Sequence, residues 1–481
     1  MTDHPRLSNK TLRDLAPGIA RPAYDRAALA PGIVHFGPGA FQRAHLASFI
    51  DRLLPADPRW GIVGVALRTG AAAADLKAQD HLYTLAELDV PARYRVLGAL
   101  VDTTVASADP ARAFAHLLHP AARLITITVT EKGYCLDAAG ALDLNHPDIA
   151  HDLANPAAPR SLIGWLAEGL ARRHARALPP PVVMSCDNLA ANGPKLQAAV
   201  LAFARERGRG DLAAWIESAV RFPATMVDSI TPASDEALRA RVAAATGLVD
   251  LAPVQRESFA QWVIADDLGP DAPDLASAGA QLAFDVHAYE QAKLRLLNGA
   301  HSALAYLGLA FGHATVGEAM GDAMLAGFVE RLMREDTAAT LRPARGLDIP
   351  DYIGALLRRL RNPAVAHRLA QIAADGSLKL PYRFLEPIAD LLAAGRSIDR
   401  PSVAVAAWMR FVVETARRGE VLNDPMADTL VRTAAQCTGD AAADVPRFLA
   451  LTQIFPRALA NEPRFAAALV RAYDDLRAAL L

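Results

Sequence analysis

Three polar residues, Lys293, Asn298 and His301, lie in an otherwise mostly apolar segment that runs from Tyr289 to Tyr306. On a helix that turns about 100° per residue, Asn298 lies about 140° and His301 about 80° round from Lys293, so the three share one broad face. Burial lowers the pKa of a lysine until it can accept a proton near neutrality, so the segment predicts a general base. The alternative is a lysine that reaches solvent beside a hydrogen-bonded core histidine.

Other polar residues could assist such a base. Glu290 lies three residues before Lys293 on the same predicted helix face, where it could form an ion pair or pass on the proton that the lysine takes. Asn188 follows an apolar run, and its amide, like that of Asn298, could donate to a substrate oxygen. Two such donors are what a developing alkoxide needs.

A glycine turn directly follows the first apolar run of the chain. Ile33–Phe36 leads into Gly37-Pro38-Gly39-Ala40-Phe41, and the residues from there to Leu54 have a helical pattern. Glycines let the backbone approach a pyrophosphate, and the start of a helix supplies N–H groups for it. The turn predicts a dinucleotide cradle that includes Gly37, Gly39, Ala40 and Phe41. The usual third glycine is absent, so an ordinary strand-to-helix turn is the alternative.

Arg68 stands at the end of the second apolar run, where NAD-binding proteins often have an acidic residue that holds the ribose hydroxyls. An arginine there could stack on adenine or meet the extra phosphate of NADP. The residue leaves the choice between NAD and NADP open, and a solvated arginine at a strand end is the alternative.

Polar clusters follow two further apolar runs. Thr128–Tyr134 contains Glu131, and Ser185–Asn188 contains the predicted amide donor. The carboxyl ends of strands are where open α/β sheets bind ligands, although such clusters are also ordinary turns. Asp228 and Glu257 are carboxylates beside strand-like stretches, and both residue types also simply cap or hydrogen-bond backbone.

The pattern of elements changes near residue 284. From Gly32 to about residue 283, short apolar runs alternate with amphipathic stretches, which is typical of a mostly parallel sheet in an α/β fold. Beyond Asp285 the chain has Leu and Ala at helical spacing, interrupted by prolines. We therefore expect a dinucleotide-binding, Rossmann-like domain over residues 1–284 and a mainly helical substrate-binding and catalytic domain over 285–481. The clearest predicted strands are Ile33–Phe36, Trp60–Leu67, Arg123–Val129 and Val182–Met184, and a helix is predicted from about 160 to 178.

Composition excludes several classes of protein. The 481 residues carry 50 Lys and Arg against 52 Asp and Glu, so no overall field favours nucleic acid or an anionic membrane. The three cysteines are far apart, and no His, Cys or Glu cluster has the spacing of metal ligands. No signal peptide and no apolar run of about 18 residues is found, so we expect a cytoplasmic protein.

These motifs together resemble a known family, the polyol-specific long-chain dehydrogenases, which include mannitol 2-dehydrogenase and fructuronate reductase (mannonate oxidoreductase). The resemblance covers nearly the whole chain. Its most specific part is the Lys-x4-Asn-x2-His signature, met by Lys293, Asn298 and His301. The other motifs in register are Gly37-x-Gly39, Thr130–Tyr134, Ser185–Asn188, Met226–Asp228 and Gln261-Trp262.

The resemblance implies metal-independent hydride transfer between a nicotinamide cofactor, NAD with NADP still open, and a secondary alcohol of an open-chain sugar derivative. It implies that Lys293 removes the hydroxyl proton, that Asn188 and Asn298 hold the oxygen and that His301 orients the substrate. Glu290 matches a glutamate that is implicated in proton transfer, and Lys379 matches a lysine that contacts the substrate. We expect a substrate cleft between the two domains, with Asp228 as a further substrate-binding residue.

Segments of the second half look more like fructuronate reductases than mannitol dehydrogenases, and Gln371 stands where mannitol dehydrogenases typically place an arginine. Gln42, Ser229 and Ala260 depart from both patterns, and the missing arginines weaken the case for a carboxylate-bearing substrate. We expect D-mannonate and D-fructuronate, with mannitol, sorbitol or arabinitol as alternatives. A catalytically silent dinucleotide sensor is the alternative of another class. The oligomeric state is open.

Overall fold

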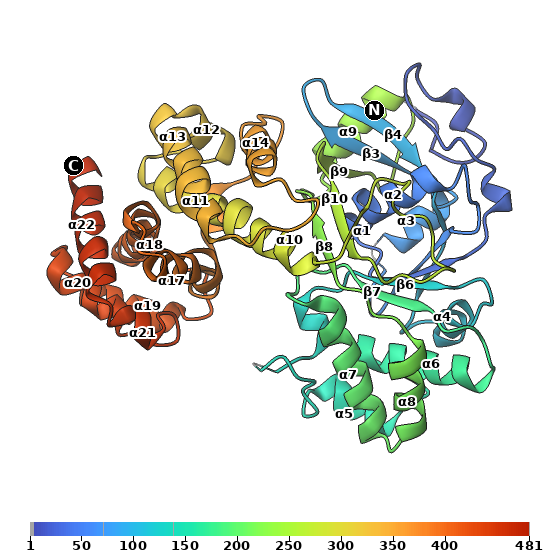
Figure 1. Cartoon of the computed structure of the whole chain (residues 1–481). Coiled ribbons are helices and arrows are strands. Elements are labelled where there is room, and N and C mark those ends of the chain that lie inside the picture. Colours follow the sequence, from blue (N-terminus) through green and yellow to red (C-terminus); the bar gives the residue numbers. More distant parts are fainter. Residues whose placement is uncertain (1–3, 71, 138, 481) are drawn as a thin grey trace. The chain divides into compact units, whose positions relative to one another are not determined.

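The computed structural model describes residues 4–70, 72–137 and 139–480. The chain forms two compact units, Met1–His287 and Ala288–Leu481. The expected Rossmann-like first part and helix-rich second part are confirmed (Figure 1). The exact domain boundary between residues 284 and 285 stays a prediction.

The first unit contains a five-stranded parallel sheet in the order β5-β2-β1-β6-β7. Its strands are β1 (Ile33–Phe36), β2 (Ile62–Ala66), β5 (Leu100–Val105), β6 (Leu124–Ile127) and β7 (Val182–Ser185). Four of the five coincide with the predicted strands. Numbered along the chain within this sheet, the order is 3-2-1-4-5, which is the order of dinucleotide-binding folds.

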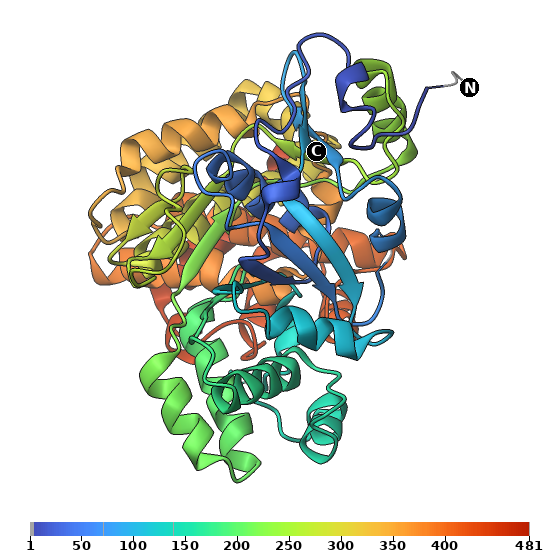
Figure 2. The same ribbon diagram turned by 90° about the vertical axis from the view of Figure 1, so that its right-hand side faces the viewer.

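Both faces of this sheet are buried, because successive side chains point to opposite sides. Val34 and Phe36 of β1 pack in one hydrophobic cluster, and Ile33 packs in another. Figures 1 and 2 show the helices α5 to α8 gathered on one side of the sheet. The helices of this unit are α1 (Ala40–Ala44), α2 (Leu46–Leu53), α3 (Ala73–Ala78), α4 (Pro110–Leu117), α5 (Pro147–Ala154), α6 (Leu162–Ala175), α7 (Asn192–Glu206), α8 (Gly210–Ala219) and α9 (Glu236–Thr246), with short 3-10 turns at Leu12–Asp14, Arg26–Ala28 and Glu131–Tyr134.

Two smaller sheets were not predicted. One pairs β4 (Arg93–Leu97), β3 (Tyr83–Leu88) and β9 (Val254–Glu257), and the other pairs β11 (Gln281–Ala283), β10 (Gln261–Ala265) and β8 (Thr225–Asp228). Each contains one antiparallel pair. The helix predicted up to Leu54 is also interrupted, because His45 leaves helical geometry between α1 and α2.

The second unit is helical throughout its described residues apart from loops and isolated bridges. Its core contains a large cluster to which α11 and α18 contribute many residues. Its elements are α10 (Val286–Ala292, which begins in the first unit), the π-helical segment η4 (Lys293–Asn298), α11 (Gly299–Ala310), α12 (Val316–Gly321), α13 (Ala323–Arg331), the π-helical η5 (Leu332–Asp336), the 3-10 turn η6 (Thr337–Thr340), α14 (Ile349–Leu360), α15 (Leu369–Ala373), α16 (Gly376–Leu380), the π-helical η7 (Pro381–Leu385), α17 (Glu386–Ala393), α18 (Asp399–Arg417), α19 (Ala427–Ala434), α20 (Ala441–Leu449), α21 (Arg457–Ala460) and α22 (Pro463–Leu480). In the part of the chain that the structure describes, no helix has the length and apolar character to cross a membrane.

Candidate functional site

The first candidate site lies where β1 and β6 leave the sheet in neighbouring positions. The chain continues from β1 toward β2 on one side and from β6 toward β7 on the other, so the gap between them is the topological switch point. Open α/β sheets bind ligands just beyond the carboxyl ends of the strands at this point. Gly37 follows β1 and Thr128 follows β6, so both predicted motifs are at this edge.

Gly37 closes the turn against Thr128. Its φ is +88°, and a Cβ on Gly37 would lie 2.0 Å from the Thr128 carbonyl oxygen, so only glycine fits. The Thr128 hydroxyl donates to the Gly37 carbonyl at 2.8 Å. Below the turn, the fully buried His35 ring lies 2.8 Å from the Thr126 hydroxyl and 2.9 Å from the Thr128 hydroxyl. Burial lowers the pKa of His35 to about 3, so this support is a neutral imidazole.

Gly39 has a different surrounding. Its φ of −80° suits any residue, and a Cβ there would meet no atom closer than the Gly37 carbonyl oxygen at 3.8 Å. Gly39 lines a cavity of about 710 Å³, and a side chain at this position would project into open space. Such open space would let a pyrophosphate approach the backbone itself, and the role of the turn as a cradle stays a prediction.

The charges around the cavity suit an anionic dinucleotide. Arg43, Arg68, Lys132 and Arg160 line it, with Asp148 as an acidic side chain of the lining. Of the predicted cofactor residues, Gly37, Gly39, Ala40 and Arg68 line this cavity. Phe41 instead stacks on the His45 ring at 5.0 Å, and the exposed Glu131 lies next to the lining residues Lys132 and Gly133. The roles of Phe41 and Glu131 stay predictions.

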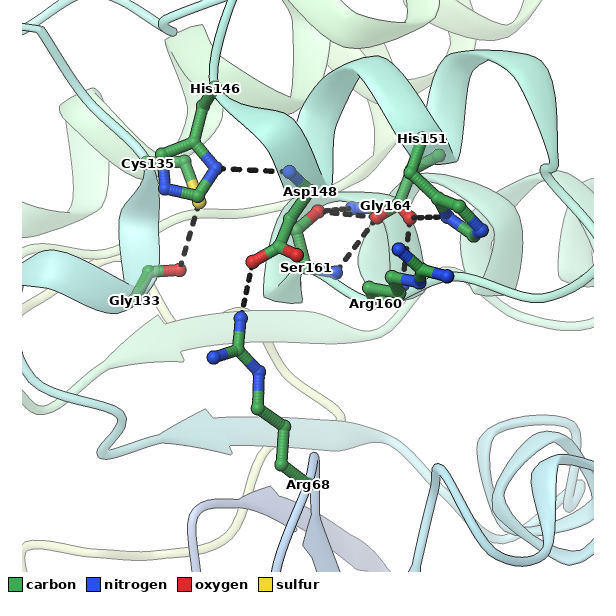
Figure 3. Close-up of polar contacts among 10 residues, drawn as sticks. Arg68, Gly133, Cys135, His146, Asp148, His151, Arg160, Ser161 and Gly164 are labelled. Atoms are coloured by element: carbon green, nitrogen blue, oxygen red, sulfur yellow. Dashed lines mark hydrogen bonds and ion pairs between the residues drawn. The ribbon is translucent and has the colours of Figure 1, made fainter.

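Arg68 does not extend freely into the cavity. Its Nη2 forms an ion pair with Asp148 Oδ2, which comes from the first turn of α5 (Figure 3). The Arg68 carbonyl oxygen accepts from the Ser107 hydroxyl at 3.0 Å, which fixes the base of the side chain. The Asp148 N–H donates to His146 Nδ1 at 3.2 Å. Asp148 lies 80 residues from Arg68 in the sequence, and this pair was not predicted.

A buried carboxylate holds the adjoining wall of the cavity. Asp152 accepts from the Arg160 N–H at 2.8 Å and from both the N–H and the hydroxyl of Ser161, at 2.8 and 2.6 Å. Ser161 in turn caps α6 by accepting from the Gly164 N–H at 2.9 Å (Figure 3). Arg160 and Ser161 line the cavity, so these bonds fix the position of its wall.

Asp187 joins the two polar clusters that follow β6 and β7. Its carboxylate accepts from the Val129 N–H at 2.9 Å, the Thr130 N–H at 3.0 Å and the Tyr134 hydroxyl at 2.7 Å. Burial raises the pKa of Asp187 above its usual range. Thr130 is held at φ +70°, outside the usual region for a threonine. The neighbouring Asn188 is exposed, and Asp187 thereby fixes the loop that presents it.

The two other carboxylates named from the sequence have different surroundings. Glu257 accepts from the Ile230 N–H at 2.6 Å, which fits the reading of a backbone-bonding residue. Asp228 is buried at the end of β8, paired in register with Gln261 of β10. Its role in substrate binding stays a prediction.

The second candidate site begins at a π-helical turn in the second unit. The segment Lys293–Asn298 is π-helical rather than α-helical, and the Gly299 N–H bonds to the carbonyl of Leu294, five residues earlier. This corrects the prediction of a regular helix over this stretch. In an α-helix, Lys293 and Asn298 would be about 140° apart. A π turn brings residue i+5 nearly over residue i, as an α turn does for i+4, and such turns are frequent at functional sites. The five-residue spacing of the signature thus matches the local geometry.

The residues of this segment are withdrawn from solvent to different degrees. Lys293 and Asn298 are half-buried, while Glu290 on α10 and His301 on α11 are 8% and 7% exposed. The His301 ring lies 5.2 Å from that of His367 in an edge-on arrangement. Lys293 is therefore a partly buried residue on an element whose Leu296 and Leu297 pack in the core. The general-base role of Lys293 stays a prediction.

Arg383 contacts this segment, and Lys379 is a second cation whose pKa is affected by the Arg383 charge. Arg383 Nη1, on η7, donates to the Asn298 carbonyl at 3.1 Å and to the Ser302 hydroxyl at 2.7 Å. Lys379 Nζ, on α16, donates to the carbonyls of Ile372 at 3.2 Å and Ala374 at 2.5 Å.

Both groups are partly desolvated. Burial lowers the pKa of Arg383 to about 10, and burial followed by the charge of Arg383 lowers the pKa of Lys379. Burial also lowers the pKa of His367, with the Lys379 charge adding to the effect. The arrangement therefore places positive charge next to Asn298. Arg383 was not predicted from the sequence, although its position four residues after Lys379 was a signal.

No group of three or more His, Cys, Asp or Glu side chains is placed to hold a metal ion among the residues that the structure describes.

Both halves of the chain match models of known protein domains. Residues 31–276 match the mannitol dehydrogenase Rossmann domain, and residues 285–477 match the mannitol dehydrogenase C-terminal domain.

Characterised relatives are similar over nearly the full length. The chain is 39% identical to D-mannonate oxidoreductase of Escherichia coli strain K12 over 97% of each protein. It is 36% identical to a mannitol 2-dehydrogenase of Phaeosphaeria nodorum, over 98% of this chain and 83% of the relative. Among solved structures it resembles Pseudomonas fluorescens mannitol 2-dehydrogenase in ternary complex with NAD and D-mannitol, with a TM-score of 0.83 and 37% identity over 98% of this chain and 97% of the other. A substrate-free D-sorbitol dehydrogenase gives a TM-score of 0.90 with 32% identity over 98% of both chains.

Proposed function

The chain belongs to the mannitol dehydrogenase family, and on that premise we propose that it is an NAD-dependent oxidoreductase that interconverts D-mannonate and D-fructuronate. The family membership makes it an oxidoreductase, and the relative solved with NAD bound supports NAD as the cofactor. The choice of a sugar acid rather than a sugar alcohol is our proposal. The relative named D-mannonate oxidoreductase, 39% identical over 97% of both chains, supports it.

The observation that carries the choice of substrate is the position of Arg383 against Asn298, together with the second cation Lys379. Arg383 donates to the Asn298 carbonyl, and its charge adds to burial in lowering the pKa of Lys379. A sugar acid differs from a sugar alcohol by a carboxylate, and a guanidinium is the natural partner of that group. Arg383 supplies the arginine that the sequence analysis had missed.

In the proposed reaction, NAD held in the cavity beside Gly37 and Gly39 would supply the acceptor for the hydride that leaves the carbinol carbon. Lys293 accepts the hydroxyl proton at Nζ, so that the C–O bond becomes a carbonyl as the carbon loses hydrogen with its electron pair. The amides of Asn298 and Asn188 donate to the oxygen while negative charge develops on it. His301 orients the substrate, and Glu290 takes the proton onward from Lys293. No residue in this scheme requires a metal ion.

Initial rates on a matched set of substrates test the proposal. D-Mannonate, D-mannitol, D-sorbitol and D-arabinitol are each offered with NAD, and D-fructuronate and D-fructose with NADH. We expect kcat/KM for D-mannonate to exceed that for D-mannitol by at least about 100-fold, which is about 2.7 kcal/mol of transition-state stabilisation from the carboxylate. Equal or higher kcat/KM for any of the sugar alcohols would overturn the substrate assignment.

Mannitol and fructose are the second candidate. The Pseudomonas fluorescens enzyme, 37% identical, was solved with D-mannitol bound. Ser229, which stands where the family usually has an arginine, donates its hydroxyl to the Phe259 carbonyl at 2.8 Å and offers no positive charge to a carboxylate. The same rate measurements separate the two candidates.

A further inference from the structure

The ion pair between Arg68 and Asp148 lies on the nucleotide cavity, and from it we propose that Asp148 is the residue that makes this protein select NAD over NADP. The inference rests on the proposed function only in that the cavity holds a dinucleotide. It assigns a discriminating role to an acidic residue on α5, far along the chain from the strand end where such an acid is usually found.

The position of Arg68 is the first step. Arg68 follows β2, which lies directly beside β1 in the sheet. In sheets of this order, the residue at the end of the second strand meets the adenosine ribose. An acid there binds the ribose hydroxyls of NAD, and an arginine there binds the 2′-phosphate of NADP. Arg68 taken alone would therefore favour NADP.

Asp148 changes that preference, because its carboxylate forms an ion pair with the Arg68 guanidinium. The Arg68 side chain is 71% exposed and that of Asp148 is 18% exposed, so the carboxylate is the fixed member of the pair. Both residues line the cavity. The Arg68 backbone is held by the Ser107 hydroxyl, which donates to its carbonyl. The Asp148 backbone is held by its N–H, which donates to His146 (Figure 3).

The consequences differ for the two cofactors. A 2′-phosphate would have to displace the Asp148 carboxylate from Arg68 and then remain next to its negative charge, and like charges at short range repel. A 2′-hydroxyl has no such conflict, since it can donate a hydrogen bond to the same carboxylate. Asp148 thus does from α5 what an acid at the end of β2 does in other NAD-binding proteins.

Binding rather than turnover tests the proposal, so that the result does not depend on the substrate. Isothermal titration of the full chain measures Kd for NADH and NADPH, and for the fragments 5′-ADP and 2′,5′-ADP. We expect the wild-type protein to bind NADH at least about tenfold more tightly than NADPH. In Asp148→Asn, the Kd for NADPH falls at least tenfold and the Kd for NADH changes less than about threefold.

Two further variants test whether the effect is specific to Asp148 and depends on its ion pair with Arg68. Asp143→Asn removes a carboxylate from the segment just before α5, where it accepts from the Asn145 N–H at 2.9 Å, and should leave the NADH to NADPH ratio unchanged. Arg68→Ala removes the group that Asp148 occupies. In that background, Asp148→Asn should improve NADPH binding by less than threefold, because no guanidinium is released.

The outcomes separate this inference from the proposed function. Equal wild-type affinities, or an Asp148→Asn variant that changes both affinities by the same factor, would mean that the pair only ties α5 to the sheet, and would overturn the role of Asp148 alone. Failure of the wild-type chain to bind any of the four nucleotides would overturn both the inference and the proposed function. The unliganded melting temperature of each variant verifies that it is folded.

Discussion

Alanine substitutions at the two glycines of the turn after β1 should have different effects. Gly37→Ala should lower the stability of the fold, and Gly39→Ala should weaken cofactor binding. Gly37 has φ +88°, and a Cβ there would lie 2.0 Å from the Thr128 carbonyl oxygen. The left-handed conformation alone costs an alanine about 1–2 kcal/mol, and relieving the backbone contact adds strain, so we expect a total of about 3 kcal/mol. At about 2–4 °C per kcal/mol, Gly37→Ala should lower the melting temperature by about 6–12 °C.

Gly39→Ala should leave the fold intact and damage cofactor binding instead. The φ of −80° suits alanine, the nearest atom to the new Cβ is 3.8 Å away, and the loss of glycine's freedom in the unfolded chain adds about 0.4–1 kcal/mol of stability. The same methyl group projects into the cavity where the backbone must approach a pyrophosphate. We expect at least a tenfold rise in the Kd of NADH, or about 1.4 kcal/mol.

Thermal melting without ligand and titration with NADH measure the two effects separately. A Gly39→Ala variant with the wild-type Kd would show that no pyrophosphate lies against this turn. A Gly37→Ala variant that melts at the wild-type temperature would refute the steric reasoning about Thr128.

Three further predictions follow from single features of the structure. Burial lowers the pKa of His35 to about 3 in the folded chain. Between pH 6.5 and pH 3 this histidine is therefore protonated in the unfolded chain but neutral in the folded chain. The free energy of unfolding should fall by about 1.4 kcal/mol for each unit of decreasing pH. Urea unfolding at pH 6.5 and pH 5 should show a loss of about 2 kcal/mol, and an equal loss in a folded His35→Gln variant would assign it to other groups. Arg383→Met should raise KM for D-mannonate at least about tenfold while the Kd of NADH stays constant, and Arg383→Lys should recover part of the loss, whereas an unchanged KM would remove Arg383 from substrate recognition. Exhaustive treatment with a chelator should leave kcat unchanged, and a loss of activity that added zinc restores would contradict metal independence.

The elements that carry the first site were predictable because their signals are local. The run Ile33–Phe36 is apolar and short, and the glycines after it mark a turn, so strand, turn and helix start follow from the residues themselves. The small mixed sheets escaped prediction because their pairing is long-range. Leu85, for example, pairs with Val254, and nothing near either residue indicates the other.

The contrast between local signals and long-range contacts also explains which features of the two candidate sites were not predicted. The apolar residues around Lys293 predict a helix but do not reveal a π turn, because they are spread over a broad arc of the helix and no single narrow face marks where the turn widens. Its signal is the spacing of five between Lys293 and Asn298, which suits a π turn better than an α turn. Asp148 meets Arg68 only because α5 returns to the edge of the sheet, and a contact of this kind is set by tertiary packing. Arg383 could have been found from its position one helical turn after Lys379.

The most direct test of the proposed chemistry is the replacement of Lys293 by alanine, measured with D-mannonate and NAD across pH 6 to 10. A general base contributes about 100-fold to 10,000-fold to the rate, so kcat/KM should fall by at least about 100-fold while NADH binds with its wild-type Kd. The pH dependence that deprotonation of the lysine gives to the wild-type rate should vanish with it. A Lys293→Ala variant that turns over within a few-fold of the wild-type rate, with the same pH profile, would contradict the assignment of this amine as the base.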